Sequence, residues 1–213
     1  LQGNYIEAFH RMPVPENLGT PGQRNSRWEN NSAPVIQNVQ HRPILPSPDD
    51  PIIVTATIRD RSGIESTLLN YRIDNGSPKW QSVMMVDDGS EGDIIAFDGL
   101  FTGTIPPQEN RRIVAFHLEA IDHATPPRQS RFPVDSTSQN CLIRIGETPL
   151  ENGLGVYRLW VASDHFDEWS SNDRPNTSNE PLDATFVYND ERVIYNVGAT
   201  YSGSFFNSPR YTS

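Results

Sequence analysis

Several features on which large protein classes depend are scarce in this sequence. The single cysteine, Cys141, rules out a disulfide within the chain, and its place in the alternating stretch C-L-I-R-I indicates a buried thiol on a strand. No apolar run approaches the roughly 20 residues that a membrane-spanning helix needs, so no membrane span is predicted. Residues 1–10 lack the charged and apolar regions of a signal peptide.

Positive charge is scarce as well. Lysine and arginine together number 17 against 27 aspartate and glutamate residues, which gives a net charge of −10, and Lys79 is the only lysine. A surface of this charge repels phosphate backbones, and no basic stripe offsets the repulsion. Nucleic acids are therefore excluded as expected partners.

Turn-forming residues and alternating patterns are abundant. The chain has 18 prolines and 14 glycines, and only 35% of its residues are hydrophobic, which favours short strands over packed helices. In residues 52–59, every second side chain is apolar and lies on one face of a strand, and similar alternation recurs up to residue 146. Strands are predicted at 35–40, 52–59, 68–73, 80–86, 101–105, 113–121 and 141–145, and further ones at 156–162, 184–188, 193–197 and 199–206. This number and spacing predict an all-β protein built on an antiparallel β-sandwich with additional C-terminal β-strands.

The central part of the chain resembles bacterial immunoglobulin-like (Ig-like) or fibronectin-III-like modules. The resemblance lies in A-T-I-R-D-R-S-G-I-E-S-T-L-L-N-Y-R (56–72), D-D-G-S-E-G-D-I-I-A-F-D-G-L-F-T-G-T-I-P (87–106) and V-A-F-H-L-E-A-I-D (114–122). It implies a spacer or adhesive unit over residues 33–146 rather than an enzyme.

The two flanks resemble other families. G-T-P-G-Q-R-N-S (19–26) resembles the closing P-G-x-x-N signature of bacterial lamin-tail domains, which makes residues 1–32 the end of such a unit with its linker. Residues 147–213 resemble the N-terminal strands of a spore-coat protein H (CotH) kinase-family domain, cut short, in Y-R-L-W-V (157–161), A-T-F-V-Y-N-D-E-R-V-I-Y-N-V-G (184–198) and G-A-T-Y-S-G-S-F-F (198–206). The order lamin tail, Ig-like, CotH implies a large bacterial multidomain protein that is secreted or held at the cell surface.

The CotH resemblance also implies a nucleotide-binding segment. Gly198, Gly203 and Ser204 match the family's Gly-rich pattern G-x-R-x-x-G-x-S, with Thr200 in place of its arginine, so they are the candidate cofactor-binding residues. A plain strand hairpin explains the same glycines. The family's lysine and metal-binding acids would follow residue 213, and Lys79 is distant in sequence. No catalytic residues are identified, and the chain is expected to be non-catalytic by itself.

The stretch from Val86 to Pro106 carries the candidate metal ligands. Asp87, Asp88, Asp93 and Asp98 are gathered there among glycines, and two interpretations remain open. Aspartate and glycine build turns, and clustered carboxylates also bind hard cations such as Ca²⁺. If strands alternate in direction and residues 94–97 form no extra strand, Asp60 and Asp122 end their strands at the same pole and become further candidate ligands.

Three functions follow as hypotheses. The first is a non-catalytic structural or interaction segment, stiffened by Ca²⁺ at the Asp-rich loop, whose partners are neighbouring domains of the same polypeptide. The second is a fragment of a CotH-type phosphotransferase lobe. The third is a carbohydrate-binding module using Tyr157, Trp160, Phe166 and Trp169, although core packing also explains the strand aromatics Tyr157 and Trp160.

Apolar side chains in the last 70 residues predict an additional contact. Phe186, Tyr188, Phe205 and Phe206 would leave uncovered faces and strand edges on a truncated domain. We expect these strands to pack against the sandwich or to self-associate with another copy of the chain. His117 is expected on the solvent side of its strand, on the face of Glu119.

Overall fold

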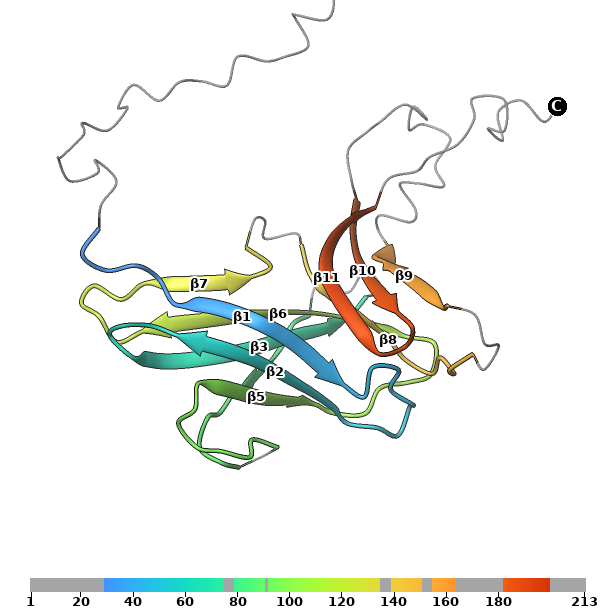
Figure 1. The fold of residues 1–213 in the computed structure, drawn as a ribbon, viewed down its shortest axis with the longest axis horizontal. Coiled ribbons are helices and arrows are strands. Elements are labelled where there is room, and N and C mark those ends of the chain that lie inside the picture. The colour runs from blue at the N-terminus through green and yellow to red at the C-terminus, as the bar shows by residue number, and fades with distance from the viewer. Residues whose placement is uncertain are drawn as a thin grey trace, which may run out of the picture. The chain divides into compact units, whose positions relative to one another are not determined.

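The computed structural model describes residues 29–74, 79–90, 92–134, 139–150, 155–163 and 182–199. The chain divides into two compact units, Leu1–Ser32 and Ala33–Ser213, and every strand found in the described residues lies in the second. The strands are β1 (Val35–Arg42), β2 (Ile52–Arg59), β3 (Ile64–Ile73), β4 (Gln81–Met84), β5 (Leu100–Ile105), β6 (Ile113–Asp122), β7 (Gln129–Phe132), β8 (Cys141–Arg144), β9 (Tyr157–Val161), β10 (Leu182–Tyr188) and β11 (Arg192–Ala199) (Figure 1). All pairs are antiparallel, so the predicted all-β class is confirmed. No helix within the described residues is long and apolar enough to cross a membrane.

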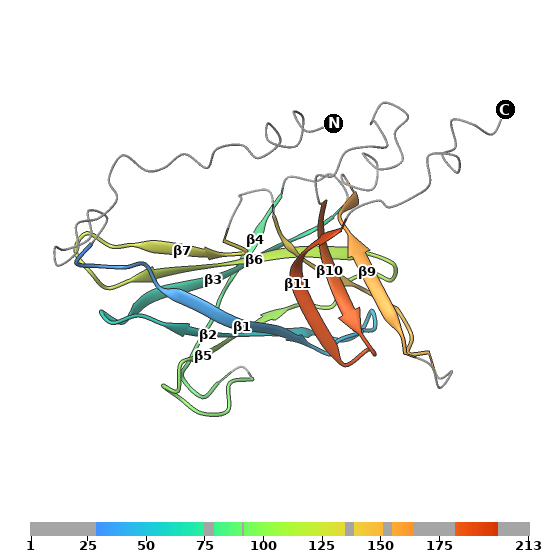
Figure 2. The same ribbon diagram turned by 45° about the horizontal axis from the view of Figure 1, so that its top comes forward.

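Two sheets form the sandwich. One has the strand order β1-β2-β5 and the other β4-β3-β6-β7, with β8 paired to the first half of β6, and Figure 2 shows them as two layers. Because side chains alternate along a strand, Ile52, Val54, Ala56 and Ile58 all point from β2 into the space between the layers, where each is at most 2% exposed. The predicted core face of β2 is therefore confirmed.

The long strand β6 is buried on both faces. Val114, Phe116, Leu118 and Ala120 face the sandwich core as the alternation predicts. The prediction that His117 faces solvent is wrong, since this side chain is 9% exposed. The ring of Trp80, which precedes β4, covers it edge-on at a centroid distance of 4.6 Å. Burial and, to a smaller extent, the charge of Arg131 lower the pKa of His117 to about 4.

Strand β7 is absent from the sequence-based set. Its four residues, Q-S-R-F, carry no apolar alternation, and they form a strand because their backbone pairs with Leu118–Ile121 of β6. The strand predicted at 199–206 reaches the structure only through Ala199, the last residue of β11, and its remainder lies outside the described residues.

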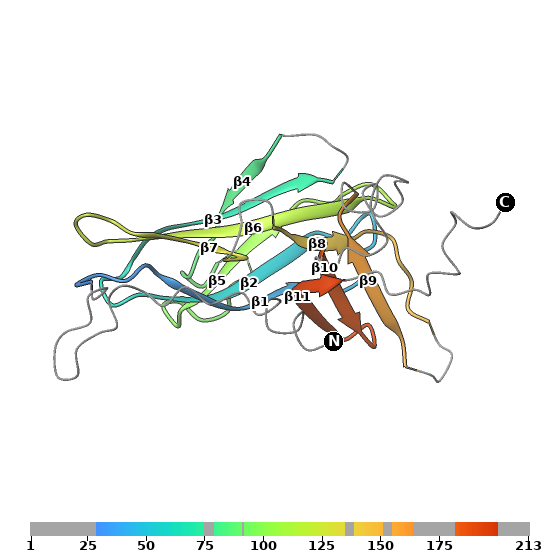
Figure 3. The same cartoon turned by 90° about the horizontal axis from the view of Figure 1, so that it is seen from above.

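The last three strands form a third sheet with the order β11-β10-β9, placed beside the start of β6 and β8 (Figure 3). The predicted hairpin turn at Asn189 and Asp190 is present, with φ of 51° and 54°, as the turn types that match strand twist require. An extra residue on β11 forms a bulge opposite Ala184–Phe186, and Asn196 there has a φ of 52°. The bulge turns Tyr195 toward the sandwich core, where it is 9% exposed.

Candidate functional site

The Asp-rich loop connects β4 to β5 and lies at the end of the sandwich where β2 ends. Val86 and Thr102 exchange two backbone hydrogen bonds of 2.9 and 2.8 Å, which close the base of the loop. Where the loop runs into β5, the Ile58 N–H of β2 donates to the Gly99 carbonyl oxygen at 2.9 Å. The loop is thus attached to β2 and β5, and residues 94–97 form no further strand.

Asp87 organises the second half of the loop. Its carboxylate accepts the N–H groups of Asp98 (3.2 Å) and Gly99 (3.0 Å), and its carbonyl oxygen accepts the Phe97 N–H (3.2 Å). Three successive amides therefore bind one residue, which explains why Phe97 keeps a φ of 63° that a bulky residue rarely adopts. Ile94, Ile95 and Phe97 are left 89%, 61% and 88% exposed, a feature that sequence reasoning missed.

Asp93 organises the first half. It is only 6% exposed, and its two carboxylate oxygens accept the N–H groups of Gly89 (2.7 Å) and Ile95 (3.3 Å). Asp98 accepts the Leu100 N–H at 2.8 Å. These bonds are what turn-building aspartates make, so the simpler interpretation of the loop accounts for much of its geometry.

The loop also brings three carboxylates to one point. Asp87, Asp93 and Asp98 each offer an oxygen, and these three oxygens lie within 4.8 Å of one another. Two ligands of a single Ca²⁺ can be at most about 5 Å apart, because each Ca–O bond is about 2.3–2.6 Å long. No other group of three or more His, Cys, Asp or Glu residues in the described parts of the chain meets this condition. The arrangement fits a hard divalent cation.

The other acidic candidates lie outside this group. Asp88 accepts the N–H and hydroxyl of Ser90, at 3.0 and 2.5 Å, and Asp60 accepts those of Ser62, at 2.7 and 2.6 Å. Asp122 is fully buried and accepts the N–H groups of Ala124 and Arg128 at 3.2 and 2.8 Å. Asp60 and Asp122 do share one end of the sandwich, since each terminates a strand that adjoins the turn into β3, but each carboxylate closes its own turn.

The candidate cofactor-binding glycines are only partly placed. Gly198 lies on β11, directly opposite Asp183 of β10, as an ordinary member of a strand pair. Gly203 and Ser204 lie outside the described residues. Lys79 lies in the connection between β3 and β4, two strands of a different sheet from that of Gly198.

The third sheet packs on the sandwich through a contact region that we call the joint. It consists of Trp160, Asp183, Thr185, Val187 and Tyr195 of the third sheet, with His41, Ala115, Phe116, Asn140 and Leu142 of the sandwich. Its apolar centre is formed by Ala115, Leu142, Trp160 and Val187, each at most 4% exposed. The prediction that the C-terminal strands pack against the sandwich is confirmed for β9–β11. Phe186 and Tyr188 point to the outer side, away from this contact, and Phe205 and Phe206 lie outside the described residues.

Tyr195 is a residue of the third sheet whose side chain packs into the core of the sandwich. Its ring meets Phe116 edge-on at 5.4 Å, and its hydroxyl bonds to Nδ1 of His41. Burial lowers the pKa of His41 to about 4, so the ring is neutral, and Nε2 donates to the Ile44 carbonyl oxygen at 3.1 Å. Nδ1 must then be the acceptor, and Tyr195 the donor.

The polar part of the joint covers a strand edge. β8 pairs with β6 on one side only, and the N–H groups of Asn140 and Leu142 point the other way. The Asp183 carboxylate accepts the first at 2.9 Å, and the Thr185 hydroxyl accepts the second at 3.0 Å. Alternate side chains of β10 thus satisfy alternate amides of β8, so the edge does not remain open.

Ionic and polar contacts flank the joint. Arg158 of β9 bonds to Asp190 at 2.6 Å and to Glu147 at 2.9 Å, and the Asp190 hydrogen bond raises the pKa of the Arg158 guanidinium. On the other side, the Ser163 N–H donates to the Asp74 carboxylate at 2.7 Å. The segments that follow β3 and β8 are therefore bonded to β9 and to the residues just after it, while the Arg158–Asp190 pair connects β9 to the β10–β11 turn within the third sheet.

The aromatic candidates are divided by burial. Trp160 is 4% exposed within the joint, while Phe166 and Trp169 lie outside the described residues. Tyr157 is 64% exposed on the outer face of the third sheet. There it stacks against Phe186 at 6.0 Å and contacts Tyr188 at 5.5 Å, two residues that the aromatic set from the sequence did not contain.

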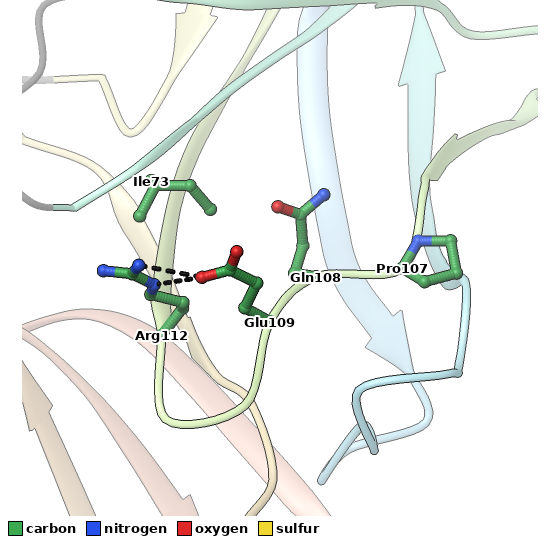
Figure 4. A pocket seen from close by; sticks show the side chains of 5 residues that line it. All are labelled: Ile73, Pro107, Gln108, Glu109 and Arg112. Carbon is green, nitrogen blue, oxygen red and sulfur yellow. Dashed lines mark hydrogen bonds and ion pairs between the residues drawn. The ribbon is translucent and has the colours of Figure 1, made fainter.

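One cavity opens at the connection between β5 and β6. It has a volume of about 280 Å³ and is lined by Ile73, Pro107, Gln108, Glu109 and Arg112 (Figure 4). Glu109 and Arg112 bind each other at 2.8 Å, so the two charges of the cavity are already paired. It contains no nucleophile next to a base.

Comparison with known proteins gave no match, either among family models or among curated proteins.

Proposed function

We propose that the chain is a non-catalytic structural segment of a secreted or cell-surface bacterial protein, which spaces and presents neighbouring domains of the same polypeptide. The observation that carries this proposal is the joint. The Tyr195 hydroxyl, the Thr185 hydroxyl and the Asp183 carboxylate bond across it, around an apolar centre. A contact of this kind holds two sheets in one fixed orientation, which is the property that a spacer needs.

The strand order supports a particular sandwich type. β1-β2-β5 opposite β4-β3-β6 with β7 and β8 is the arrangement expected of an Ig-like or fibronectin-III-like module. In this proposal residues 1–32 end a lamin-tail-like unit, and the third sheet begins a CotH-like domain.

The rigidity of the joint can be measured by native-state hydrogen exchange on the whole chain. If the joint is rigid, the amides of Leu142 and Val187 exchange only when the sandwich core itself unfolds. Thr185→Val removes the acceptor of the Leu142 N–H and should speed exchange there, whereas Thr185→Ser keeps the acceptor and should not. Fast exchange throughout β9–β11 in the unmodified protein would contradict the proposal.

Ca²⁺ binding at Asp87, Asp93 and Asp98 is the second part of the proposal. The cation would offset the mutual repulsion of three carboxylates that the loop backbone brings together, and so would stiffen the connection between β4 and β5. A ligand that binds only the folded state raises stability by mass action, by about 2.7 kcal/mol at a hundred times its dissociation constant.

Thermal unfolding with and without Ca²⁺, after chelation, tests the metal site. Unmodified protein should gain melting temperature with Ca²⁺ in the roughly 10⁻⁴–10⁻³ M range typical of extracellular modules. Asp93→Asn should lose this gain, while Asp88→Asn, a turn carboxylate outside the group, should keep it. No calcium-dependent shift in the unmodified protein would remove the metal from the proposal and leave the joint untouched.

A carbohydrate-binding role is the second candidate, and one observation favours it. Tyr157, Phe186 and Tyr188 form a partly exposed aromatic patch on a sheet surface, and aromatic rings with a polar tip are suited to amphipathic ligands. A glycan array with unmodified protein and Tyr157→Ala distinguishes the roles. Binding that is lost in the variant would favour a carbohydrate module, and no binding would leave the spacer role.

The phosphotransferase alternative has less support. Its only placed residue, Gly198, is paired in a strand, and Lys79 lies in a connection between two strands of another sheet. Calorimetric titration with ATP and Mg²⁺ tests this alternative directly, and a binding heat that saturates with added ATP would support it.

Self-association remains a proposal as well. β9 and β11 are the outer strands of the third sheet, so each has an edge that no described strand pairs. Sedimentation over a range of protein concentrations would detect it.

A further inference from the structure

The Asp-rich loop carries an exposed apolar segment, residues 94–97, which we call the tip. Ile94, Ile95 and Phe97 are 89%, 61% and 88% exposed, although apolar residues of this size are usually buried. The small residue Ala96 is the one that turns back, since its Cβ atom lies 3.6 Å from the position that a Cβ atom on Gly89 would take. Figure 1 and Figure 2 show the loop projecting from the sandwich beyond β5. The fold thus presents the three large apolar side chains of the tip to solvent.

The backbone of the tip is fixed although its large side chains are exposed. The Asp93 carboxylate accepts the Ile95 N–H at 3.3 Å, and the Asp87 carbonyl oxygen accepts the Phe97 N–H at 3.2 Å. Phe97 has a φ of 63°, a left-handed conformation that asparagine or glycine adopts at lower cost than an aromatic residue. A phenylalanine here costs stability and, being exposed, returns little packing. Strain of this kind is found at binding sites, where a contact outside the fold accounts for it.

Carboxylates flank the tip and decide what can cover it. Asp88 and Asp98 are exposed on either side of it in the sequence, and Asp87 is half-buried. The Arg59 guanidinium lies at the base of the loop, next to Gly99. The negative charge of the loop, on a chain with a net charge of −10, repels an anionic membrane surface and also a second copy of the same loop. The complementary surface is therefore apolar at its centre and basic at its rim.

We propose that the tip is a docking element that inserts into an apolar pocket with a basic rim on a partner protein. A few anchor residues that fill a pocket carry most of the energy of such contacts, and the tip supplies three candidates for this role. The exposed carboxylates set the orientation and speed the encounter. Because Asp87 and Asp93 hold the backbone beforehand, little ordering is needed on binding. The docking role goes beyond the spacer function and does not depend on Ca²⁺.

Two model hosts test this chemistry on the whole chain in the presence of chelator. β-Cyclodextrin has an apolar cavity that accepts an aromatic ring, and its amino-substituted derivative adds ammonium groups at the rim. In calorimetric titration, the unmodified protein should bind the cationic host several-fold more tightly than the neutral host. Phe97→Asn should lose this tighter binding and should melt at or above the temperature of the unmodified protein, since asparagine suits the left-handed backbone. Tyr157→Ala, which removes an exposed ring far from the loop in sequence, is the control and should keep the tighter binding.

The same variants decide between the possible occupants of the tip. Equal affinity of the unmodified protein for the two hosts, or a preference for the cationic host that survives in Phe97→Asn, would overturn the proposal. Flotation with vesicles of phosphatidylcholine, with and without phosphatidylglycerol, tests a membrane, and sedimentation over a range of protein concentrations tests a second copy. We expect neither vesicle binding nor self-association that depends on Phe97. Either one, if lost in Phe97→Asn, would assign the tip to that occupant and overturn the proposal.

Discussion

The sandwich core and the joint bury similar side chains but are held together differently. The core between the two layers is made almost entirely of aliphatic and aromatic residues, such as Val54, Leu69 and Leu118 at 0% exposure. The joint has a smaller apolar centre and, around it, buried polar bonds made by His41, Thr185 and other side chains.

The difference matters for specificity. Apolar packing is strong but tolerates changes of partner and orientation, as long as the total volume is kept. A buried polar bond adds little net free energy when it is made, yet leaves a costly unpaired group in any arrangement that breaks it. The core therefore supplies most of the stability, while the joint fixes the orientation of the third sheet. The predictions below distinguish these two contributions.

The largest effect is expected in the core. Leu118→Ala leaves a cavity beside a fully buried position of β6 and should lower the free energy of unfolding by about 2–5 kcal/mol. Urea denaturation measures the change. Met84→Ala, at a side chain that is 64% exposed, is the control and should change stability by less than about 0.5 kcal/mol. A small effect of Leu118→Ala would mean that the sandwich is less tightly packed than its burial indicates.

The second largest effect is expected from lowering the pH, which should weaken the joint. The folded state holds the pKa of His41 at about 4 against its ordinary 6.5, so the unfolded chain binds more protons between these values. The contribution of His41 to the free energy of unfolding is therefore fully present above about pH 6.5. It falls by about 3 kcal/mol as the pH falls toward 4. His117 acts in the same direction and window.

Urea denaturation between about pH 7 and about pH 4.5 measures this loss. His117→Gln removes the second histidine, so that the remaining pH dependence reports His41. A flat profile in this variant would mean that His41 keeps its charge on folding and that Tyr195 is not its hydrogen-bond donor.

Removing one hydroxyl of the joint should have a moderate effect. Tyr195→Phe keeps the ring against Phe116 but leaves His41 Nδ1 without its donor, and should cost about 1–3 kcal/mol. Hydrogen exchange should quicken in β9–β11 more than in β2, because the joint opens before the core. Equal quickening in both would show that the two regions form a single cooperative unit.

The smallest effect is expected on the outer face of the third sheet. Leu159 is 47% exposed, so Leu159→Thr should change the free energy of unfolding by less than about 0.5 kcal/mol. A loss of several times this size, dependent on protein concentration, would show that a second copy of the chain covers this face.

The sequence predicted the sandwich well where one physical signal dominates. The alternation in Ile52–Arg59 gave the observed strand and its buried face, because only one side of β2 packs on the core. The alternation pattern failed to predict burial where the second face of a strand is also covered by other residues. His117 was predicted to be an outward position of β6, but Trp80 covers it, and Ala115 on the same face of the strand is buried against the third sheet. The two-residue alternation along a strand shows which side chains share a face of the strand, but it does not show what packs against that face.

The candidate site shows the same limit. The aspartates and glycines of the loop were evident from their spacing, and three of the four aspartates meet in space. That the loop also lies against Thr102 of β5, where Gly92 approaches the Thr102 methyl group, could not be read from the sequence, because Thr102 lies on a strand outside the loop. Thr185 and Tyr195 of the joint looked like ordinary strand residues for the same reason.

By itself, the sequence determined the all-β class, most strand positions, the core face of the sandwich and the acidic character of one connection. These are local properties, set by side-chain alternation and turn chemistry within a few residues. Only the tertiary structure decided which carboxylates meet, and that the third sheet is bonded to the sandwich by Tyr195 and Thr185. These contacts join residues up to 154 positions apart, and packing of separate strands, not local preference, brings such residues together.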